Sequence, residues 1–510
     1  MASARDRGVV VTVEPIALTE EATIDRLSDV LARLGYDGRT VRTLLGEDAY
    51  QARRRDVPVH LRRLFEDSPL ATAIRLLFLG VTVPEAEVAA ALAPLTIEEL
   101  VKLGLVDHID TAVRATVRLV PHADLLLAGS RYPDAPGEIP ADYVATATAP
   151  SAILANLTVR RRVGTALDIG TGSGIQALWA ARHCDQVVAV DVNRRALNLA
   201  AFNARLNGVT NIEFREGSLF DPVARDRFDL IVCNAPYVVS PDLRYAYRDG
   251  GIASDGFSEL LAREAPRHLE DGGFAHLLIG WVLSEEDWAA RPRSWVADSD
   301  CDCWLLLGVS RDPIGHAALW NQELAGDEAQ FGDTLDRWID YFNNLRVNGV
   351  AEGAMILRRR RATGRHWFRA DRIPDHHPEP ASDHVLRVFA AHDHFDALED
   401  EALLLDEVVR LSDHVRFEQE LSCRDGGYVI ESMTVVLDDG LGFRAGIDQN
   451  TATLLPLLDG HRSVREAIDN AIASRVLDEG AIGAFRNSAA KIIHAMLELG
   501  FVVISERVKD

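Results

Sequence analysis

Short apolar runs alternate with helical segments through the middle of the chain. Such runs predict buried β-strands, and strands that alternate with helices predict a doubly wound parallel sheet. Five of them follow one another: TALDIG (165–170), QVVAVDV (186–192), IEFREGS (212–218), DLIVCN (229–234) and FAHLLIG (274–280). Two more, CWLLLGV (303–309) and GAMILRR (353–359), enclose a helical insert at about 311–349. We therefore expect an α/β domain with a Rossmann-like sheet over residues 146–362.

The two outer regions have other patterns. In residues 1–145, apolar positions recur at helical spacing and lead to a hairpin-like segment at 112–129, which predicts a helical, winged-helix-like domain. Such a domain either reads nucleic acid or substrate, or serves only for packing, and the acidity of the chain favours packing. Residues 363–510 open with a polar segment, RIPDHHPEPASDH (372–384), which predicts a linker. Strand-like runs and a second winged-helix-like unit follow and predict an α+β domain.

Composition restricts the classes of function. Among 510 residues the formal net charge is −24, so nothing in the balance of charges indicates non-specific binding to nucleic acid or to an anionic membrane. No apolar run approaches the length of a membrane span, and the N-terminal stretch MASARDRGVVVTVEP has no apolar core long enough for a signal peptide, so we expect a cytoplasmic protein without a membrane partner. The 5 cysteines form no CxxC pair, which predicts free thiols and no metal site.

A glycine-rich loop follows the first central strand, in ALDIGTGSGIQAL (166–178). Gly170, Gly172 and Gly174 allow a tight turn and a close approach of the backbone to a ligand. A dinucleotide loop would need another glycine where Ile175 stands, so a pyrophosphate is not expected. The second strand ends at Asp191, where a carboxylate can accept hydrogen bonds from both hydroxyls of a ribose.

The fourth strand ends at Asn-Ala-Pro-Tyr, residues 234–237. In open α/β sheets, ligands bind beyond the carboxyl ends of the strands, so this turn is placed at the expected site. An amide oxygen on Asn234 and the main-chain carbonyl of Ala235 can each accept one N–H of a planar NH₂ group. Pro236 shapes the turn, and the ring of Tyr237 can stack on the acceptor. A strand-ending turn without chemistry is the alternative, since asparagine and proline are common in turns.

Together these motifs resemble a family. Residues 164–280 are similar to class I S-adenosylmethionine-dependent methyltransferases of the "methyltransferase small" group, which includes release factor glutamine methyltransferases and ribosomal RNA guanine-N2 methyltransferases. The resemblance implies a seven-stranded methyltransferase sheet and S-adenosyl-L-methionine as cofactor. It places Asp168 near the cofactor's amino group, the glycine loop near its sulfonium and Asp191 at its ribose. Ser218 and Leu219, within GSLF (217–220), would lie beside adenine.

The resemblance leaves the methyl acceptor open among protein, RNA and small molecules. The family pattern Asn-Pro-Pro-Tyr or Asp-Pro-Pro-Tyr predicts transfer to an amide or amine nitrogen, with Ala235 here in place of the first proline. Asn234 and Tyr237 would be the catalytic pair, and Asn234 would also contact the cofactor. O-methylation of a small metabolite is the alternative within enzymes. From another class, the chain could be a regulatory protein that binds the cofactor without catalysis. Tyr247 and Arg248, in the loop after the turn, are further candidate substrate contacts.

A group of histidines and an arginine-rich stretch are not expected to form functional sites. His376, His377, His384, His392 and His394 lack the helical spacing of a metal site, and we expect a solvated linker. The arginine-rich stretch 358–372 carries Trp367 and Phe368, but in an acidic chain its arginines are expected to be solvent-facing residues of a sheet edge.

Overall fold

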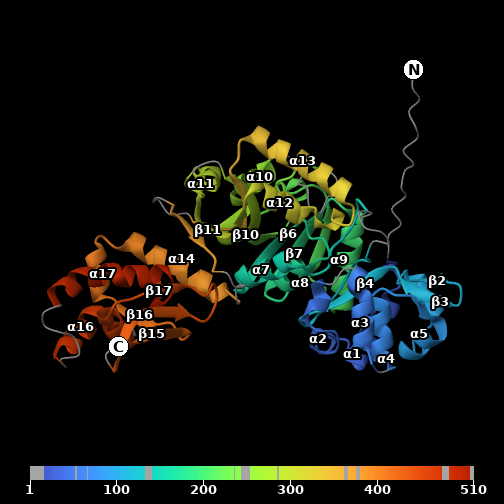
Figure 1. Cartoon of the computed structure of the whole chain (residues 1–510), viewed down its shortest axis with the longest axis horizontal. Coiled ribbons are helices and arrows are strands. Elements are labelled where there is room, and N and C mark those ends of the chain that lie inside the picture. Colours follow the sequence, from blue (N-terminus) through green and yellow to red (C-terminus); the bar gives the residue numbers. More distant parts are fainter. Residues whose placement is uncertain are drawn as a thin grey trace, which may run out of the picture. The chain divides into compact units, whose positions relative to one another are not determined.

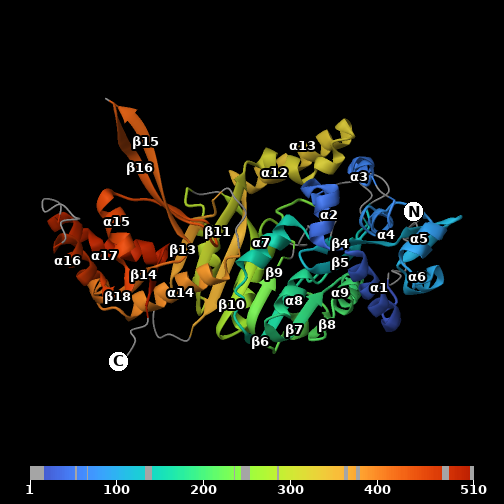
Figure 2. The same cartoon turned by 90° about the horizontal axis from the view of Figure 1, so that it is seen from below.

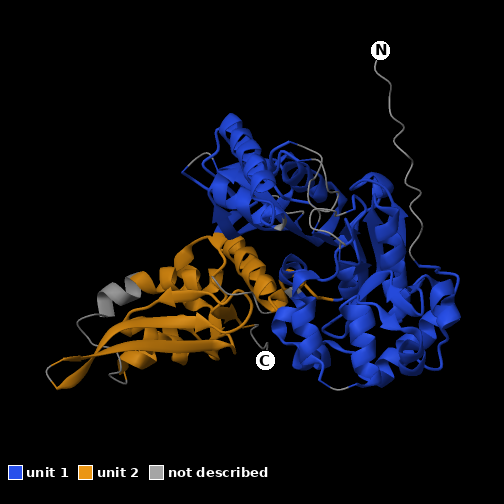
Figure 3. Ribbon diagram, turned by 45° about the vertical axis from the view of Figure 1, so that its right-hand side comes forward, with its two compact units in different colours: residues 1–154, 162–361, 366–370 blue, residues 155–161, 362–365, 371–510 orange. Residues whose placement is uncertain are grey.

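The computed structural model describes residues 16–51, 54–65, 67–132, 140–234, 236–242, 253–283, 286–360, 366–374, 380–424, 426–473 and 482–505. Contacts between residues divide the chain into two compact units (Figure 3). Unit 1 holds residues 1–154, 162–361 and 366–370, and unit 2 holds residues 155–161, 362–365 and 371–510. Most residues of the predicted N-terminal and methyltransferase domains thus fall in the same unit.

A large mixed sheet is the centre of unit 1 (Figures 1 and 2). Its strand order is β13-β11-β12-β10-β9-β6-β7-β8, in which β6 to β10 pair in parallel and β12 runs antiparallel to both neighbours. The strands are β6 (Val163–Ile169), β7 (Cys184–Asp191), β8 (Ile212–Glu216), β9 (Phe228–Cys233), β10 (Leu269–Leu283), β11 (Cys301–Arg311), β12 (Gly349–Arg359) and β13 (Phe368–Arg372). The predicted α/β sheet is confirmed, with eight strands where seven were expected. The additional strand lies beside β11, where the amide of Cys303 donates to the carbonyl of Trp367 over 2.9 Å.

The order of the strands determines where the sheet can bind a ligand. The chain moves from β6 to β7 on one side and returns to β9 on the other, so the direction of winding reverses beside β6. Such a reversal leaves a crevice beyond the carboxyl ends of the strands. Helices α8 and α9 pack against β6, β7 and β8, and α10 and α11 pack against β10. These helices are α8 (Ile175–Ala180), α9 (Arg194–Leu206), α10 (Gly256–Glu264) and α11 (Ala290–Val296).

The N-terminal part of unit 1 shares a hydrophobic core with the sheet domain. Leu199 and Phe202 of α9 lie fully buried in the same cluster as the N-terminal helices. Asn198 reinforces this contact, because its side chain both accepts from and donates to the backbone of Ile16, over 3.1 and 2.9 Å. The elements are α1 (Glu21–Leu34), α2 (Gly38–Leu45), η1 (Glu47–Gln51), η2 (Arg54–Asp56), α3 (Val57–Arg63), α4 (Pro69–Ala73), η3 (Ile74–Phe78), β1 (Val83–Pro84), α5 (Glu85–Ala91), α6 (Ile97–Leu103), β2 (Val106–Ile109), β3 (Ala112–Ala115), β4 (Val117–His122) and β5 (Leu125–Ser130). Helix α7 (Ala149–Leu157) follows them, and its last three residues, 155–157, belong to unit 2.

Smaller elements complete unit 1. After β8 comes η4 (Asp221–Val223), and before β10 comes η5 (Ala265–His268). Between β11 and β12 the chain forms an insert of α12 (Pro313–Trp320), η6 (Gln322–Leu324) and α13 (Glu328–Leu345). The insert packs Trp338 and Phe342 against Val238 and Val239, which follow the Asn-Ala-Pro-Tyr turn, in a buried cluster of its own.

Unit 2 combines helices with two small sheets, β18-β14-β19 and β15-β16-β17. Figure 2 shows β15 and β16 as a long hairpin that extends away from the helices of this unit. Its elements are α14 (Ser382–Ala397), η7 (Glu401–Asp406), β14 (Val408–Leu411), β15 (Val415–Arg424), β16 (Gly427–Leu437), β17 (Arg444–Gly446), α15 (Gln449–Leu454), η8 (Leu455–Leu457), β18 (Asp459–Ser463), α16 (Val464–Ala473), α17 (Ile482–Glu498) and β19 (Val502–Ile504).

Two of the minor expectations are wrong. His384, His392 and His394 lie on α14, not in a linker, and His384 is buried and bonded through both ring nitrogens, to Leu441 N and Leu499 O. His376 and His377 lie outside the described residues. Arg358 and Arg360 do not simply face solvent, because both bind the buried carboxylate of Asp302. A buried charge with two guanidinium partners explains why these arginines turn inward.

Within the described residues, no helix is long and apolar enough to cross a membrane. The same part of the chain contains no group of three or more histidine, cysteine, aspartate or glutamate side chains that could hold a metal ion. The cytoplasmic location stays a prediction.

Candidate functional site

A cavity of about 580 Å³ opens at the carboxyl ends of β6, β7 and β9. Its volume falls in the range of small-molecule and cofactor sites, about 300–1,000 Å³. Of the residues that the sequence singled out, its walls include Asp168, Gly170, Gly172, Asp191, Ser218, Leu219, Asn234, Pro236 and Tyr237. Residues that are separate in the sequence therefore meet around one space, because the ends of parallel strands lie at the same edge of the sheet.

Asp168, at the end of β6, is buried, with 1% of its surface exposed. Its Oδ2 accepts hydrogen bonds from Thr171 Oγ1, over 2.6 Å, and from Ala177 N, over 3.0 Å. These bonds hold the glycine loop against the start of α8. Burial raises the pKa of Asp168 to about 7, and the hydrogen bonds from Thr171 and Ala177 only partly oppose this shift. A positive group entering the cavity beside Asp168 would favour its ionised form.

Asp191, at the end of β7, is engaged by the backbone on both oxygens. Oδ2 accepts from Gly172 N over 2.9 Å, and Oδ1 accepts from Asn193 N over 2.8 Å. Burial raises its pKa, against the opposing effect of these backbone hydrogen bonds. Since each carboxylate oxygen has two lone pairs, both can still accept a hydroxyl of a ribose. Asp191 thus connects the glycine loop with the predicted ribose position.

Asn234 directly follows β9, and a hydrogen bond orients its side chain. Its Nδ2 donates a hydrogen bond to Ser151 Oγ over 3.2 Å. Ser151 is itself held near the start of α7, where its Oγ and the Oγ1 of Thr148 are 2.8 Å apart and Gln176 Nε2 donates to its carbonyl over 2.8 Å. The amide nitrogen of Asn234 is therefore directed to α7, and its oxygen remains as the acceptor for a ligand.

Tyr237 is placed by a close backbone contact. A Cβ on Gly280 of β10 would lie 2.3 Å from the carbonyl oxygen of Tyr237, so only glycine permits this approach. Burial, together with the negative charge of Glu352, raises the pKa of the Tyr237 phenol well above its usual range. The phenol is therefore neutral at physiological pH, and Tyr237 offers a ring and a hydroxyl group but no base.

Some predicted residues lie elsewhere. Gly174 does not line the cavity but precedes α8, where a Cβ would come within 3.0 Å of the Cβ of Ala200. Its role in the structure is the close packing of the loop against α9, the third function of glycine in such loops. Ala235, Tyr247 and Arg248 lie outside the described residues.

Other residues of the cavity wall were missed by the sequence interpretation. Thr148 and Ser151 come from the segment before β6, and Phe257 comes from α10. Trp320 reaches the cavity from α12 of the insert. Only Thr148 carried a readable signal, since Thr-Ala-Pro-Ser is a helix start and the Oγ1 of Thr148 accepts the amide of Ser151 over 3.3 Å.

The residues present fit S-adenosylmethionine. The buried carboxyl group of Asp168 suits an ammonium group, and Asp191 retains lone pairs for a diol. The apolar lining by Val192 and Leu219 suits a flat base next to Asp191. The three features follow one another along the ends of β6, β7 and β8, in the order of the amino acid, ribose and adenine parts of the cofactor.

Comparisons with known proteins concern the same part of the chain. Residues 145–280 match the family described as methyltransferase small domain, and residues 33–116 match a domain of unknown function (DUF7059). A release factor glutamine methyltransferase of Xylella fastidiosa is 41% identical over 127 residues, which are 22% of this chain and 46% of the relative. A ribosomal protein uL3 glutamine methyltransferase of Bradyrhizobium diazoefficiens is 34% identical over 151 residues, 27% of this chain and 47% of the relative.

The chain therefore spans about half the length of these curated relatives. Among solved structures, a methyltransferase from Pyrococcus furiosus aligns at 18% identity over 46% of this chain and 89% of its own. Its TM-score of 0.28 is too low to support a conclusion about function.

The glycine loop, the two acids at the ends of β6 and β7, and the family match agree with one another. They bear out the resemblance found in the sequence, and the cofactor that this family implies is S-adenosyl-L-methionine. Residues 145–280 form a methyltransferase small domain of the class I S-adenosylmethionine-dependent methyltransferases.

Proposed function

We propose that the protein transfers a methyl group from S-adenosylmethionine to a side-chain amide nitrogen of another protein, held by residues 234–237. The observation that carries this proposal is the orientation of Asn234. Its nitrogen is engaged by Ser151, so its oxygen is left to accept an N–H of the incoming amide. An NH₂ group can donate one N–H to Asn234 and the other to the carbonyl of Ala235, whereas a hydroxyl group has a single proton to donate and would leave one of these two oxygens without a partner.

Amide nitrogens are poor nucleophiles because their lone pair is delocalised into the carbonyl group. Asn234, with the carbonyl of Ala235, would hold the NH₂ group so that the lone pair faces the methyl donor. Orientation of this kind can lower a barrier by about 7–11 kcal/mol in favourable cases. The bound cofactor supplies an activated methyl group, and the protein orients the acceptor nitrogen toward it. After the transfer, the nitrogen releases a proton.

Tyr237 would contribute a neutral aromatic surface beside the acceptor. Its raised pKa removes it as a base at physiological pH, which agrees with a reaction that needs none. The residues that we propose to hold the cofactor lie at the ends of β6, β7 and β8, while Tyr237 follows β9 and touches β10. The two substrates would therefore approach the reacting centre from opposite sides of Asn234.

The names of the relatives support a protein acceptor. Both of the relatives described above are named as glutamine methyltransferases, one for a release factor and one for ribosomal protein uL3. Methylation of an RNA base nitrogen or of a small-molecule hydroxyl receives no comparable support from these names. A glutamine amide in a protein of the translation machinery is thus the acceptor we propose.

The test is methyl transfer from S-adenosylmethionine that carries a labelled methyl group. The full chain is incubated with the release factor, with ribosomal protein uL3 and with total RNA from the same organism, each in a separate reaction. We expect label in protein, on a glutamine side chain located by mass spectrometry of peptides. Label confined to RNA, or a methyl group found on oxygen, would contradict the proposal.

A further inference from the structure

We propose that the insert between β11 and β12 positions the methyl acceptor, and that Trp320 of this insert contacts the acceptor directly. This inference rests on the proposed function and adds to it the part of the chain that recognises the substrate. Among the described residues of the insert, Trp320 lines the cavity. It does so from the acceptor side, because the insert follows β11, while the cofactor residues lie at β6 to β8.

The ring of Trp320 is held in place by Glu352 of β12. Trp320 Nε1 donates a hydrogen bond to Glu352 Oε1 over 3.0 Å, and the side chain of Glu352 is only 15% exposed. Glu352 is paired with Gly280 across β10 and β12, at the position where the backbone of Tyr237 approaches the sheet. Glu352 thus links the orientation of Trp320 to the location of the turn, as a positioning residue.

The insert also holds the chain that leaves the turn. His316 Nε2 is 3.0 Å from the carbonyl oxygen of Val239, and both residues are buried. One turn of α13 then binds Asp242, because Trp338 Nε1 donates to Asp242 Oδ2 over 3.0 Å and Arg337 forms an ion pair with Oδ1. Residues 238–242 are therefore fixed to the insert by packing, hydrogen bonds and charge.

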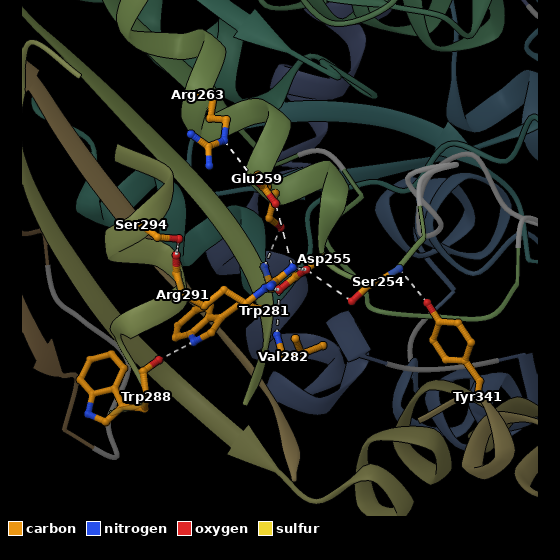
Figure 4. Close-up of polar contacts among 12 residues, drawn as sticks. Ser254, Asp255, Glu259, Arg263, Trp281, Val282, Trp288, Arg291, Ser294 and Tyr341 are labelled. Atoms are coloured by element: carbon orange, nitrogen blue, oxygen red, sulfur yellow. Dashed lines mark hydrogen bonds and ion pairs between the residues drawn. The ribbon is translucent and has the colours of Figure 1, made fainter. Parts of the chain in front are cut away.

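The chain that returns to the sheet is fixed by the same helix. The amide of Ser254 donates to the hydroxyl of Tyr341 over 2.7 Å, and Figure 4 shows Tyr341 reaching Ser254 from α13. Ser254 has a φ of 61°, an unfavourable conformation for a residue with a side chain, which this contact helps to hold. The next residue, Asp255, is anchored to the sheet by the amide of Val282 and to α11 by Arg291 (Figure 4).

These contacts have one consequence for recognition. The insert holds the chain on both sides of residues 243–252, directly after the catalytic turn, and it contributes one large ring to the cavity. Trp320 shares this cavity wall with Tyr237, and its ring is held by Glu352, so it is suited to contact the second substrate. A planar amide offers such a ring a flat surface on which to pack.

The experiment compares the full-length protein with the variants Trp320→Ala, Trp320→Phe and Glu352→Gln. Trp288→Ala is the matched control, since Trp288 is also partly buried but does not line the cavity. Methyl transfer to the release factor and to ribosomal protein uL3 is measured at saturating labelled cofactor, to obtain kcat and KM for the protein. Binding of S-adenosylhomocysteine is measured separately by calorimetry.

We expect Trp320→Ala to raise the KM for the protein about tenfold, which corresponds to about 1.4 kcal/mol, while S-adenosylhomocysteine affinity changes less than about twofold. Trp320→Phe should have a KM close to that of the wild type, and the KM of Glu352→Gln should lie between those of Trp320→Phe and Trp320→Ala. These two variants keep the test valid if Trp320→Ala does not fold. Trp288→Ala should behave as the wild type.

The two proposals fail in different ways. If the wild type binds S-adenosylhomocysteine but labels neither protein, the proposed function is wrong and this inference falls with it. If the wild type labels a protein and Trp320→Ala leaves KM unchanged, only the inference is wrong. Loss of S-adenosylhomocysteine binding in folded Trp320→Ala would assign Trp320 to the cofactor site and would also overturn the inference.

Discussion

Asn234 and Ser151 are joined by a hydrogen bond of 3.2 Å from Nδ2 of the asparagine to Oγ of the serine. An amide group directs its nitrogen and its oxygen to different sides. The bond therefore determines which end of Asn234 faces α7 and which end remains for a ligand. Ser151 is held in turn by Thr148 and by Gln176. Catalysis by Asn234 would thus depend on Ser151, which orients its amide group.

The first prediction tests this dependence. Asn234→Ala removes the oxygen that accepts the N–H of the substrate. This change should raise the activation free energy by roughly 3–4 kcal/mol and so lower the turnover rate about a hundred- to a thousandfold. Asn234→Asp keeps an oxygen at that position, and the hydroxyl of Ser151 can then donate to it, so more activity should remain. Ser151→Ala should lower turnover about tenfold, because the amide loses its orientation but not its oxygen. Single-turnover rates with labelled cofactor measure all three.

Cofactor affinity is the control for these variants and should change little. Thr158→Ala, near the far end of α7 and outside the cavity wall, is a comparison for Ser151→Ala. Equal rates in Asn234→Asp and Asn234→Ala, together with a methyl group on oxygen in the product, would contradict the role of Asn234.

The second prediction concerns Asp191. Asp191→Ala should lose hydrogen bonds to the ribose, each worth about 1.5–3 kcal/mol, and also the bonds that hold Gly172 and Asn193. Calorimetry should therefore show a loss of S-adenosylhomocysteine affinity of about a hundredfold or more. Asp185→Ala, near the start of β7, removes an exposed carboxylate at the opposite end of the same strand and should bind as the wild type. Unchanged affinity in folded Asp191→Ala would refute the ribose assignment.

The third prediction uses the pKa of Asp168, which burial raises to about 7. A carboxyl group whose pKa is raised in the folded protein favours its neutral form. Its contribution to stability is therefore full below the ordinary pKa of aspartate, near 3.8, and is lost as the pH rises through the folded-state pKa of about 7. An ammonium group beside it reverses this preference. S-adenosylhomocysteine affinity should therefore increase between about pH 6 and pH 8, with release of a proton below pH 7.

Calorimetry in two buffers of different ionisation enthalpy measures that proton. Burial also raises the pKa of Asp191, so a variant must separate the two acids. Asp168→Asn keeps an oxygen for the hydrogen bonds from Thr171 and Ala177 but cannot ionise. The pH dependence should disappear in this variant; if it persists, the proton belongs to another group.

The fourth prediction concerns stability. Asp255 is completely buried and receives two hydrogen bonds from Arg291, with Oδ1 to Nη2 at 2.6 Å (Figure 4). Arg291→Ala leaves this carboxylate without its charged partner. Because Arg291 is 42% exposed and water can partly replace it, the free energy of unfolding should fall by about 2–3 kcal/mol, below the range of about 3–5 kcal/mol for fully buried pairs.

The same helix provides the control for this variant. Arg293 pairs with Asp287, and both side chains are nearly half exposed. Arg293→Ala should lower the free energy of unfolding by about 0–1 kcal/mol, the usual contribution of an ion pair at the surface. Denaturation by urea measures the free energy of unfolding of both variants. An equal loss in the two would show that the burial of Asp255 does not determine the strength of its ion pair.

Much of the site could be predicted from the sequence, because the signals are local. The apolar runs predict the strands of the central sheet, and the sheet geometry then brings their ends to one edge. Asp168, Asp191 and Asn234 each come at the end of such a run, and the structure places all three around one cavity. The number of strands was less well predicted, since β13 is the last part of the arginine-rich stretch 358–372, and its pairing depends on a distant sheet edge.

The tertiary structure alone decided which distant residues support those three. Ser151 lies 83 residues before Asn234, and Trp320 lies in an insert whose helical pattern says nothing about the cavity. Periodicity along a segment records which face is buried, but not which partner covers it. That partner depends on how separate elements pack, and packing places the indole of Trp320 beside Glu352 and the amide of Asn234 beside Ser151.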